Sequence, residues 1–284
     1  MQTSSDKIVP ISNPEKIFWG EEQITKGDLI DYYRKISPYI LPYIINKPQS
    51  LHRFPDGYKG KSFYQKNTSN LKLPTWIKTT KIKSLHNQKF TKYLVCDSSE
   101  TLIYMINLGC IEIHPWASKI KKIDYPDWIV FDLDPIETDF KNTVKVALSL
   151  REMLSYDKWE SYCKTSGFRG IHIFVPTKNK FKYESAKEIA KQYAIKLHLS
   201  VPEITSLNRN PQKRVGKVYI DYLQNSRGQT VAAPYSVRPN KKANVSTPLL
   251  WEEVNEKLDP KIFTLRTIMK RLEIYGDVWK EILD

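Results

Sequence analysis

The stretch Trp128-Ile129-Val130-Phe131-Asp132-Leu133-Asp134-Pro135 decides the fold and chemistry expected of this chain, because an apolar run ends in two aspartates two positions apart. Successive side chains of a β-strand point to opposite faces, so Asp132 and Asp134 share one face while Leu133 points to the other. Proline donates no backbone hydrogen bond to a sheet, so Pro135 is expected to end the strand. The stretch therefore predicts a strand with two carboxylates at its end.

A second strand-like run, Val218-Tyr219-Ile220-Asp221-Tyr222-Leu223, adds a third carboxylate, Asp221. No cysteine or histidine accompanies the aspartates as a nearby ligand, and converging carboxylates suit hard cations such as Mg²⁺ or Mn²⁺. Mg²⁺ held in this way usually also binds the phosphates of a substrate. The pattern therefore favours two-metal nucleotidyl or phosphoryl transfer.

The composition agrees with a nucleic-acid enzyme. The 284 residues allow one large or two modest domains, and 45 Lys+Arg against 31 Asp+Glu give a formal net charge of +14. A basic surface attracts phosphates, although a lysine-rich, solvated surface would give the same charge. The 17 Tyr, 10 Phe and 7 Trp exceed what a core needs, so some of these rings can stack on bases.

The cysteines and the chain start indicate a cytoplasmic location. Cys96, Cys110 and Cys163 are far apart and form no CxxC pair, which argues against a structural zinc site and a disulfide framework. Residues 1–6 contain no apolar signal core, and no apolar run approaches the length of a membrane span. We therefore expect no membrane partner.

Local patterns predict helices and strands in mixed order. Thr25 and Asp28 form a capping box for a helix that Pro38 is expected to stop. Without strict βα alternation, the order indicates an α+β fold with antiparallel or mixed sheets. The other strands are expected at 50–54, 62–64, 111–114, 162–165 and 171–175, with a hairpin from 218–223 and 230–233; the helices are expected at 99–109, 144–154, 186–197 and from 251 onward.

The loop Thr165-Ser166-Gly167-Phe168-Arg169-Gly170 precedes the strand that carries His172. Its two glycines allow backbone N–H groups to approach an anion, and Ser166, Arg169 and His172 add donors or charge. The loop is a candidate cradle for a triphosphate. A glycine-flanked turn alone is more often only a turn, so this motif needs the others for support.

Several polar residues have both a functional and an ordinary interpretation. His114 ends a strand, where it could contact a base or sugar or only cap the strand, and Arg214 could meet phosphates or remain a surface cation. Lys16 and Lys26 flank the start of the first helix, and Asn13 precedes it. A helix N-terminus with lysines can hold a phosphate, whereas solvated lysines are the default alternative.

A haloacid-dehalogenase-type phosphatase is a rival explanation for Phe131-Asp132-Leu133-Asp134, since its nucleophile is the first aspartate of such a motif. That motif normally continues with Gly-Thr, lies near the N-terminus and is followed by an Asp-Asp pair. Here Pro135-Ile136 follow, the motif lies mid-chain and no later Asp-Asp pair exists. A DxD glycosyltransferase fits less well because the chain is basic.

The order of the motifs at 132–135, 166–172 and 217–223 resembles that of the archaeo-eukaryotic primase superfamily. The surrounding sequence is most similar to one branch, the polymerase domain of the bacterial and archaeal non-homologous end-joining ligase D, over residues 8–284. The matching stretches are Ser12-Asn13-Pro14-Glu15-Lys16-Ile17, Phe63-Tyr64-Gln65-Lys66-Asn67, Ile111-Glu112-Ile113-His114, Ala233-Pro234-Tyr235-Ser236-Val237-Arg238, Phe263-Thr264-Leu265-Arg266 and Tyr275-Gly276-Asp277.

The resemblance implies one polymerase domain over 1–284: an N-terminal α/β portion with DNA-end contacts (about 1–110), a catalytic RRM-like module (111–240) and a C-terminal helical tail (241–284). It implies a template-directed polymerase that prefers ribonucleotides among NTP and dNTP substrates, uses two divalent cations (Mn²⁺ or Mg²⁺), and fills gaps in double-strand break repair. Its implied partners are DNA with gaps or broken ends and a 5′-phosphate, a Ku-type end-binding protein and a DNA ligase, at the nucleoid. The non-catalytic alternative is a module that only binds DNA ends.

The resemblance also implies residue roles. Arg169 stands where a lysine is expected, and Phe63-Tyr64 replaces an expected Phe-Phe pair; charge and stacking survive, although the phosphate geometry changes. By position, Asp132, Asp134 and Asp221 would bind the metals; Ser166, Arg169, His172 and Arg238 would hold the triphosphate, with Arg214 near the metals and phosphates and His114 near the sugar; Asn13, Lys16 and Lys26 would bind the downstream 5′-phosphate; Phe63 and Tyr64 would stack on the template.

Overall fold

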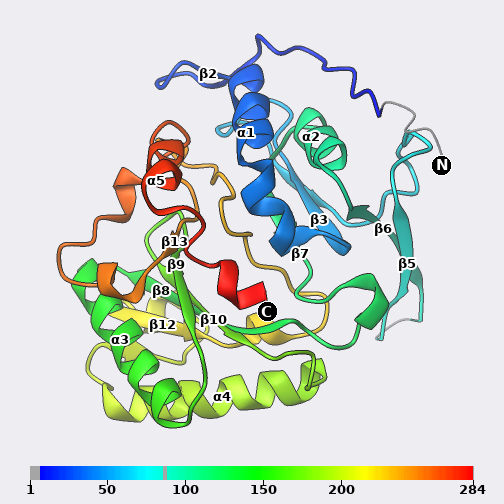
Figure 1. The fold of residues 1–284 in the computed structure, drawn as a ribbon. Helices are drawn as coiled ribbons and strands as arrows, with labels where there is room; N and C mark the ends of the chain where they lie inside the picture. Colours follow the sequence, from blue (N-terminus) through cyan, green and yellow to red (C-terminus); the bar gives the residue numbers. More distant parts are fainter. Residues whose placement is uncertain (1–6, 86–87, 284) are drawn as a thin grey trace.

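The computed structural model describes residues 7–85 and 88–283, so residues 1–6, with the missing signal core noted above, lie outside the described residues. Figure 1 shows a helix-covered sheet in the lower half and, in the upper half, a second sheet beside helices of the N-terminal part of the chain. The six strands of the lower sheet have the order β11-β12-β8-β10-β9-β13. Their bounds are Thr205–Ser206 (β11), Lys217–Asp221 (β12), Trp128–Ile136 (β8), Ile171–Pro176 (β10), Tyr162–Thr165 (β9) and Pro248–Leu249 (β13).

Helices α3 (Phe140–Tyr156) and α4 (Tyr183–Ser200) cover one face of this sheet, the lower face in Figure 1. The alternation of β8 explains which face they cover, because Ile129, Phe131 and Leu133 all join the core formed with these helices. Asp132 and Asp134 consequently point to the opposite face, which leaves the carboxylates free of the helices.

The upper half contains α1 (Lys26–Ile44) and α2 (Ser99–Asn107) with the N-terminal sheet. In this sheet β3 pairs with β4, β6 and β7, and β6 also pairs with β5. The two halves share a core: Trp128, Val130 and Phe174, on the carboxylate face of the lower sheet, pack with the N-terminal half. The strand bounds are Lys47–Arg53 (β3), Phe63–Gln65 (β4), Thr79–Lys83 (β5), Phe90–Cys96 (β6) and Cys110–Pro115 (β7), and a small hairpin, Ile17–Trp19 (β1) with Ile24–Thr25 (β2), precedes α1.

The α+β prediction is confirmed, but four local expectations are wrong. Helix α1 continues past Pro38 and Pro42 to Ile44. Pro38 cannot donate to the carbonyl of Arg34, and the hydroxyl of Ser37 donates to that oxygen instead, at 2.9 Å. Burial of apolar side chains such as Ile40 in the second half of the helix outweighs the cost of the prolines.

Strand β8 also continues past Pro135 to Ile136, which pairs with Lys217. The pairing with β10 stops at Leu133, so one side of β8 is open at Pro135 and a missing N–H is tolerated there. The predicted hairpin from 218–223 and 230–233 does not form, because β8 and β11 occupy both edges of β12. Thr230 bridges Trp116 instead.

The C-terminal region is less helical than expected. It contains α5 (Ile268–Tyr275) and 3₁₀ turns at Trp251–Glu253, Pro260–Ile262 and Lys280–Leu283. Asp277 fixes this region to the N-terminal half by accepting hydrogen bonds from the hydroxyls of Tyr43 and Tyr235, both at 2.6 Å. None of the helices between residues 7 and 283 is long and apolar enough to cross a membrane, among the residues described.

Candidate active site

One row of side chains crosses four strands on the open face of the lower sheet. The register pairs Lys164 of β9 with His172 of β10, His172 with Asp132 of β8, and Asp132 with Asp221 of β12. Side chains opposite each other on adjacent strands have Cβ atoms about 5 Å apart. The fold therefore brings Asp132 and Asp221 together from positions far apart in the sequence, with Asp134 two residues along the same face.

The pKa values of Asp132 and Asp221, which face each other in this row, are shifted in opposite directions. Burial, together with the negative charge of Asp132, raises the pKa of Asp221. Burial also acts to raise the pKa of Asp132, but His172 and the positive charges of Arg238 and Lys164 outweigh it and lower the pKa. An oxygen-only set of close carboxylates fits a hard divalent cation, which would relieve the repulsion between them.

His172 lies between a buried lysine and a carboxylate. Lys164 Nζ is 2.9 Å from His172 Nδ1, and His172 Nε2 is 3.3 Å from Asp132 Oδ1. Burial and the neighbouring Lys164 lower the pKa of His172 to about 4, so the ring is neutral at neutral pH with its proton on Nε2, toward Asp132. Lys164 was not predicted as a site residue, because its only signal in the sequence is a charged residue inside a short strand.

The glycine-flanked loop is only partly the predicted cradle. Ser166 Oγ accepts hydrogen bonds from the N–H groups of Phe168 (3.1 Å) and Gly170 (3.0 Å), so these two donors are not free for an anion. The N–H groups of Gly167 and Arg169 donate to none of the residues in 7–85 and 88–283. The Arg169 side chain is 62% exposed and contacts a predicted metal ligand, because its Nε is 3.1 Å from Asp134 Oδ1.

The two glycines of the loop permit close packing against the site. Gly167 has φ +76°, and a Cβ there would lie 2.5 Å from Cγ of Arg238. A Cβ on Gly170 would lie 2.4 Å from the carbonyl oxygen of Leu133. Arg238 in turn donates from Nη1 to the carbonyl of Ser166 at 2.5 Å. The loop therefore lies directly against both Arg238 and the aspartate strand.

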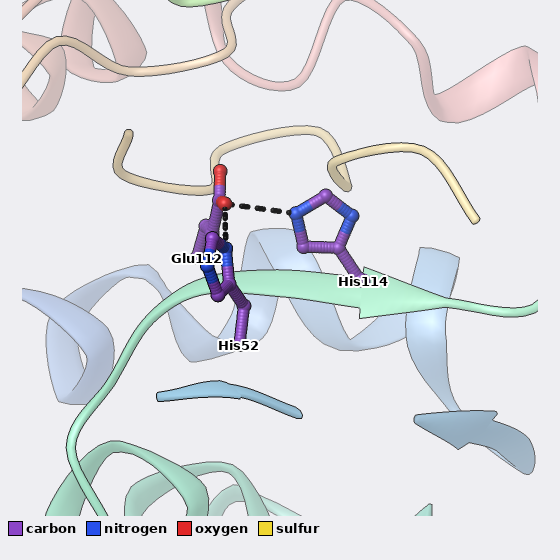
Figure 2. Close-up of side chains that lie close together, drawn as sticks. All are labelled: His52, Glu112 and His114. Carbon is purple, nitrogen blue, oxygen red and sulfur yellow. Dashed lines mark hydrogen bonds and ion pairs between the residues drawn. The ribbon is translucent and has the colours of Figure 1, made fainter. Parts of the chain in front are cut away.

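A second polar cluster lies on the N-terminal sheet and consists of His52, Glu112 and His114. Figure 2 shows both imidazoles directed at the Glu112 carboxylate. Glu112 Oε1 is 2.5 Å from His52 Nδ1 and 3.2 Å from His114 Nε2, and Arg238 Nε donates to Oε2 at 2.7 Å. Burial alone would raise the pKa of Glu112, but His114 and Arg238 outweigh it and hold that pKa well below its usual range.

The ligand atoms of His52, Glu112 and His114 lie within 4.8 Å of one another, which is close enough to hold a metal ion. The Glu112 oxygens, however, already face Arg238 and His52, and the guanidinium charge disfavours a further cation. The alternation of 111–114 places Glu112 on the His114 face and could have identified it. His52 was not foreseeable, because it reaches the cluster through the long-range pairing of β3 with β7.

Phe63 and Tyr64 border this cluster and remain accessible, with 46% and 56% of their surface exposed. The Tyr64 ring stacks on His52 with 3.9 Å between centroids and an interplanar angle of 14°, and it packs edge to face with His114 with 5.9 Å between centroids. The Arg53 guanidinium lies 5.3 Å from the Phe63 ring. Exposed rings supported in this way are suitable platforms for bases.

Arg214 lies near the aspartates, at the end of the lower sheet. Its guanidinium is 3.8 Å from the ring centre of Tyr219, the residue that pairs with Asp134. Arg214 is buried, and its Nε and Nη1 atoms have no hydrogen-bond partner among the described residues. A buried guanidinium with unused donors is suited to an anionic ligand.

Asn13, Lys16 and Lys26 lie together before and at the start of α1. The Lys16 N–H donates to the Asn13 carbonyl at 3.1 Å, and the Lys26 N–H donates to the Lys16 carbonyl at 2.8 Å. Lys16 Nζ forms an ion pair with Asp56 at 2.7 Å. Burial and the charge of Lys16 lower the pKa of Lys26, so the two ammonium groups are close enough to repel each other.

The free helix-end donors expected at this place are absent from the described structure. The N–H groups of Lys26, Gly27 and Asp28 already donate to the Lys16 carbonyl, the Pro14 carbonyl and Thr25 Oγ1. Lys26 Nζ is also occupied, and its acceptors are the Ser12 carbonyl, Ser12 Oγ and Asn107 Oδ1. A phosphate there would depend on the lysine charges and not on the first N–H groups of the helix.

Comparisons with known proteins give a consistent answer. A sequence model described as "LigD, primase-polymerase domain" matches residues 25–279. The bifunctional non-homologous end joining protein LigD of Bacillus subtilis is 33% identical over 264 residues, which are 92% of this chain and 42% of that protein. The multifunctional non-homologous end joining protein LigD of Pseudomonas aeruginosa is 32% identical over 273 residues, covering 95% of this chain and 32% of that protein.

The chain thus spans well under half the length of these relatives. Among solved structures, the polymerase domain from Mycobacterium tuberculosis ligase D in complex with DNA superposes with a TM-score of 0.90 at 25% identity, covering 98% of this chain and 99% of that chain. This likeness confirms the expected primase-like fold. The family match, the relatives and the shared fold establish that the chain belongs to the LigD primase-polymerase domain family, a family of nucleotidyltransferases.

Proposed function

We propose that this chain is a template-directed polymerase that adds nucleotides, preferably ribonucleotides, to gapped or broken DNA in non-homologous end joining. The observation that carries the proposal is the strand register that pairs Asp132 with both Asp221 and His172 on the open face of the sheet. We further propose that residues 1–284 act as one domain, with the N-terminal portion contacting DNA ends and the module at 111–240 carrying the chemistry.

Asp132, Asp134 and Asp221 would hold two divalent cations, Mg²⁺ or Mn²⁺. The donor set supports this assignment, because it contains only carboxylate oxygens and repulsion from Asp132 helps to raise the pKa of Asp221. Bound cations would supply activation of the primer 3′-hydroxyl and charge stabilisation of the leaving pyrophosphate. The neutral His172 would keep Asp132 in a fixed orientation through its Nε2 hydrogen.

The residues around Arg238 would bind the incoming nucleotide. Arg238 uses Nε and Nη1 within the protein, which leaves guanidinium donors for phosphate oxygens. Ser166 shapes the loop, Arg169 and Arg214 add positive charge, and the N–H groups of Gly167 and Arg169 would complete the triphosphate site.

His114 would contact the sugar of the nucleotide. Its imidazole is held beside Glu112 and the edge of Tyr64. Phe63 and Tyr64 would stack on the template. These assignments place the sugar contact between the template platform and the phosphate site.

Asn13, Lys16 and Lys26 would bind the 5′-phosphate on the downstream side of a gap, where two nearby lysines favour the higher charge of a terminal phosphate. A Ku-type end-binding protein and a DNA ligase would be the protein partners, with the DNA at the nucleoid in the cytoplasm. The relatives named above support this role, since both are described as non-homologous end joining proteins.

One assay tests the proposal against its alternatives. The protein is incubated with Mn²⁺, NTPs and a 5′-phosphorylated gapped duplex, beside the Asp132→Ala variant. Primer extension by wild type alone supports the polymerase. A gel shift without extension would instead indicate a non-catalytic end-binding module, and phosphate release without DNA would indicate a phosphatase.

A further inference from the structure

A pocket of about 450 Å³ lies between the β5–β6 hairpin, the start of α4 and the loop at 226–229. None of the aspartates discussed above lines it. Four cations, Lys66, Lys83, Lys187 and Arg227, contribute to its wall, whereas Glu184 is the one acidic residue among the described lining residues. This basic pocket, called the β5–α4 pocket below, is therefore a place where an anionic ligand is favoured.

The lysines of the pocket are not neutralised by the protein. Lys66, Lys83 and Lys187 form no ion pair with any residue in the described ranges, and Lys66 and Lys83 are exposed. Arg227 is different, because its Nε donates to Asp124 Oδ1 at 2.7 Å, which fixes the guanidinium in position. Three free cations from three separate segments suit a ligand with several phosphates along its length.

The floor of the pocket is aromatic. Trp116 and Tyr93 pack edge to face with 5.4 Å between their centroids, and the Arg227 guanidinium lies 5.5 Å from the Trp116 ring. Trp116 is 2% exposed, and its Nε1 has no hydrogen-bond partner among the described residues. The loop backbone at Gly228 packs on this ring, since a Cβ there would be 3.4 Å from Cζ2 of Trp116.

The pocket is connected to the proposed template platform. Lys66 directly follows β4, the strand that carries Phe63 and Tyr64, so at about 3.4 Å per residue it lies within roughly 10 Å of Phe63 along the chain. Trp116 directly follows β7, which carries His114. The segments that line the pocket are therefore direct continuations of the two strands that carry the platform and His114.

We propose that the β5–α4 pocket binds an unpaired stretch of the DNA strand that continues from Phe63 and Tyr64, with its phosphates against Lys66, Lys83 and Lys187. A positively charged groove that follows the phosphate backbone is a usual means of binding single-stranded nucleic acid without sequence preference. The path of the strand rests on the proposed function, whereas the pocket and its charge do not.

The test compares two 5′-phosphorylated duplexes whose single-stranded overhangs differ in length, one just long enough for Phe63 and Tyr64 and one several nucleotides longer. Wild type should bind the longer overhang about tenfold more tightly. Lys83→Ala/Lys187→Ala should lose this gain, keep its affinity for the short overhang, and reduce the slope of log affinity against log salt by about 2.

The matched control is Lys145→Ala/Lys196→Ala, which removes the same charge from exposed positions on α3 and α4 outside the pocket. It should keep the gain with overhang length. The proposal is overturned if wild type binds both overhangs equally, if Lys83→Ala/Lys187→Ala keeps the preference for the longer overhang, or if the control loses that preference equally. It is also overturned if excess mononucleotide abolishes the preference, since the pocket would then hold a free nucleotide. Primer-extension assays of the same proteins distinguish failure of the pocket proposal from failure of the polymerase proposal.

Discussion

Glu112 and Arg238, 126 positions apart in the chain, form an ion pair in which Arg238 Nε donates to Glu112 Oε2 at 2.7 Å. The other oxygen of Glu112 faces His52 and His114. The buried Glu112 carboxylate thus contacts His52, on which Tyr64 stacks. It also contacts His114, the proposed sugar contact, and Arg238, the proposed phosphate contact. Glu112 is therefore a positioning residue for the site.

Glu112→Gln should raise the KM for NTP by tenfold or more and affect DNA binding much less. The amide can present only one oxygen, so either Arg238 or His52 loses its acceptor, and a lost charge-assisted hydrogen bond costs about 1.5–3 kcal/mol. Steady-state kinetics on gapped DNA measure this effect. Glu256→Gln, an exposed acid 3.6 Å from Lys141, is the control and should leave KM unchanged. An unchanged KM in Glu112→Gln would contradict the positioning role.

Asp132→Ala and Asp221→Ala should each reduce nucleotide addition about a thousandfold or more while DNA binding persists. The two carboxylates pair across β8 and β12, and their removal takes away the charge that would hold the cations of the transition state. Single-turnover extension and a DNA-binding titration are measured together. Asp31→Ala, an exposed acid on α1, should behave as wild type. Near-normal extension by Asp132→Ala would refute the metal assignment.

Arg238→Ala should raise the KM for NTP by at least tenfold and weaken DNA binding less. His172→Ala should also raise this KM, because Asp132, which the His172 ring faces together with Lys164, would lose its fixed orientation. Loss of one charge-assisted hydrogen bond corresponds to about 1.5–3 kcal/mol, which sets the lower limit. Equilibrium binding of a non-hydrolysable NTP to the protein–DNA complex measures the affinity directly. If nucleotide affinity stays the same in both variants, the triphosphate binds elsewhere on the protein.

The sequence was sufficient where the information is local. Alternation along 128–135 placed Asp132 and Asp134 on one face, and Thr25 with Asp28 forms the predicted capping box. The sequence also shows the two glycines of the 165–170 loop, but it does not show why a larger residue would not fit there. Only the fold shows that a Cβ on Gly167 would collide with the side chain of Arg238.

The missed features all depend on long-range packing. His52 joins Glu112 only because β3 pairs with β7, and buried Lys164 joins the row of His172 and Asp132 only through the register of β9 with β10. The continuation of α1 past Pro38 has the same origin, because tertiary burial outweighs the local cost of proline. No pattern within a short window contains these contacts.

Lys47 and Asp127 make stability depend on pH in a specific direction. Lys47 is fully buried, lies 2.7 Å from Asp127 and sits 3.4 Å from the centre of the Trp128 ring. Burial lowers the pKa of Lys47 from 10.5 to about 8, against the opposing effect of Asp127. Between these two values the unfolded chain binds the proton more tightly than the folded protein, so the free energy of unfolding rises with pH across this window.

The stability difference between wild type and Lys47→Met should therefore increase from pH 8 to 10.5, the window of the shift, by about 3 kcal/mol across its full width. Urea unfolding at several pH values measures it. Asp127→Asn should instead cost about 3–5 kcal/mol near neutral pH, because it leaves a buried charge without its partner. A pH-independent difference between wild type and Lys47→Met would show that Lys47 titrates alike in both states.

Recognition of the 5′-phosphate should depend on Lys16 more directly than on Lys26. Lys26 Nζ already has three acceptors within the protein, whereas Lys16 is held by the single ion pair to exposed Asp56. We expect Lys16→Ala to abolish the preference of wild type for gapped DNA with a 5′-phosphate over the same DNA without it. Lys26→Met, which keeps the aliphatic stem, should weaken the preference only in part.

Asp56→Asn provides the complementary measurement, because it removes the carboxylate that competes with a phosphate for Lys16 Nζ. This variant should bind phosphorylated DNA more tightly than wild type by a few-fold, and the gain should disappear in Lys16→Ala/Asp56→Asn. Affinities at two salt concentrations separate the effect of this contact from the general attraction of a basic protein to DNA. If wild type binds both DNAs equally, or if Lys16→Ala keeps the full preference, the lysines at the start of α1 are ordinary solvated cations and the terminal phosphate is recognised elsewhere.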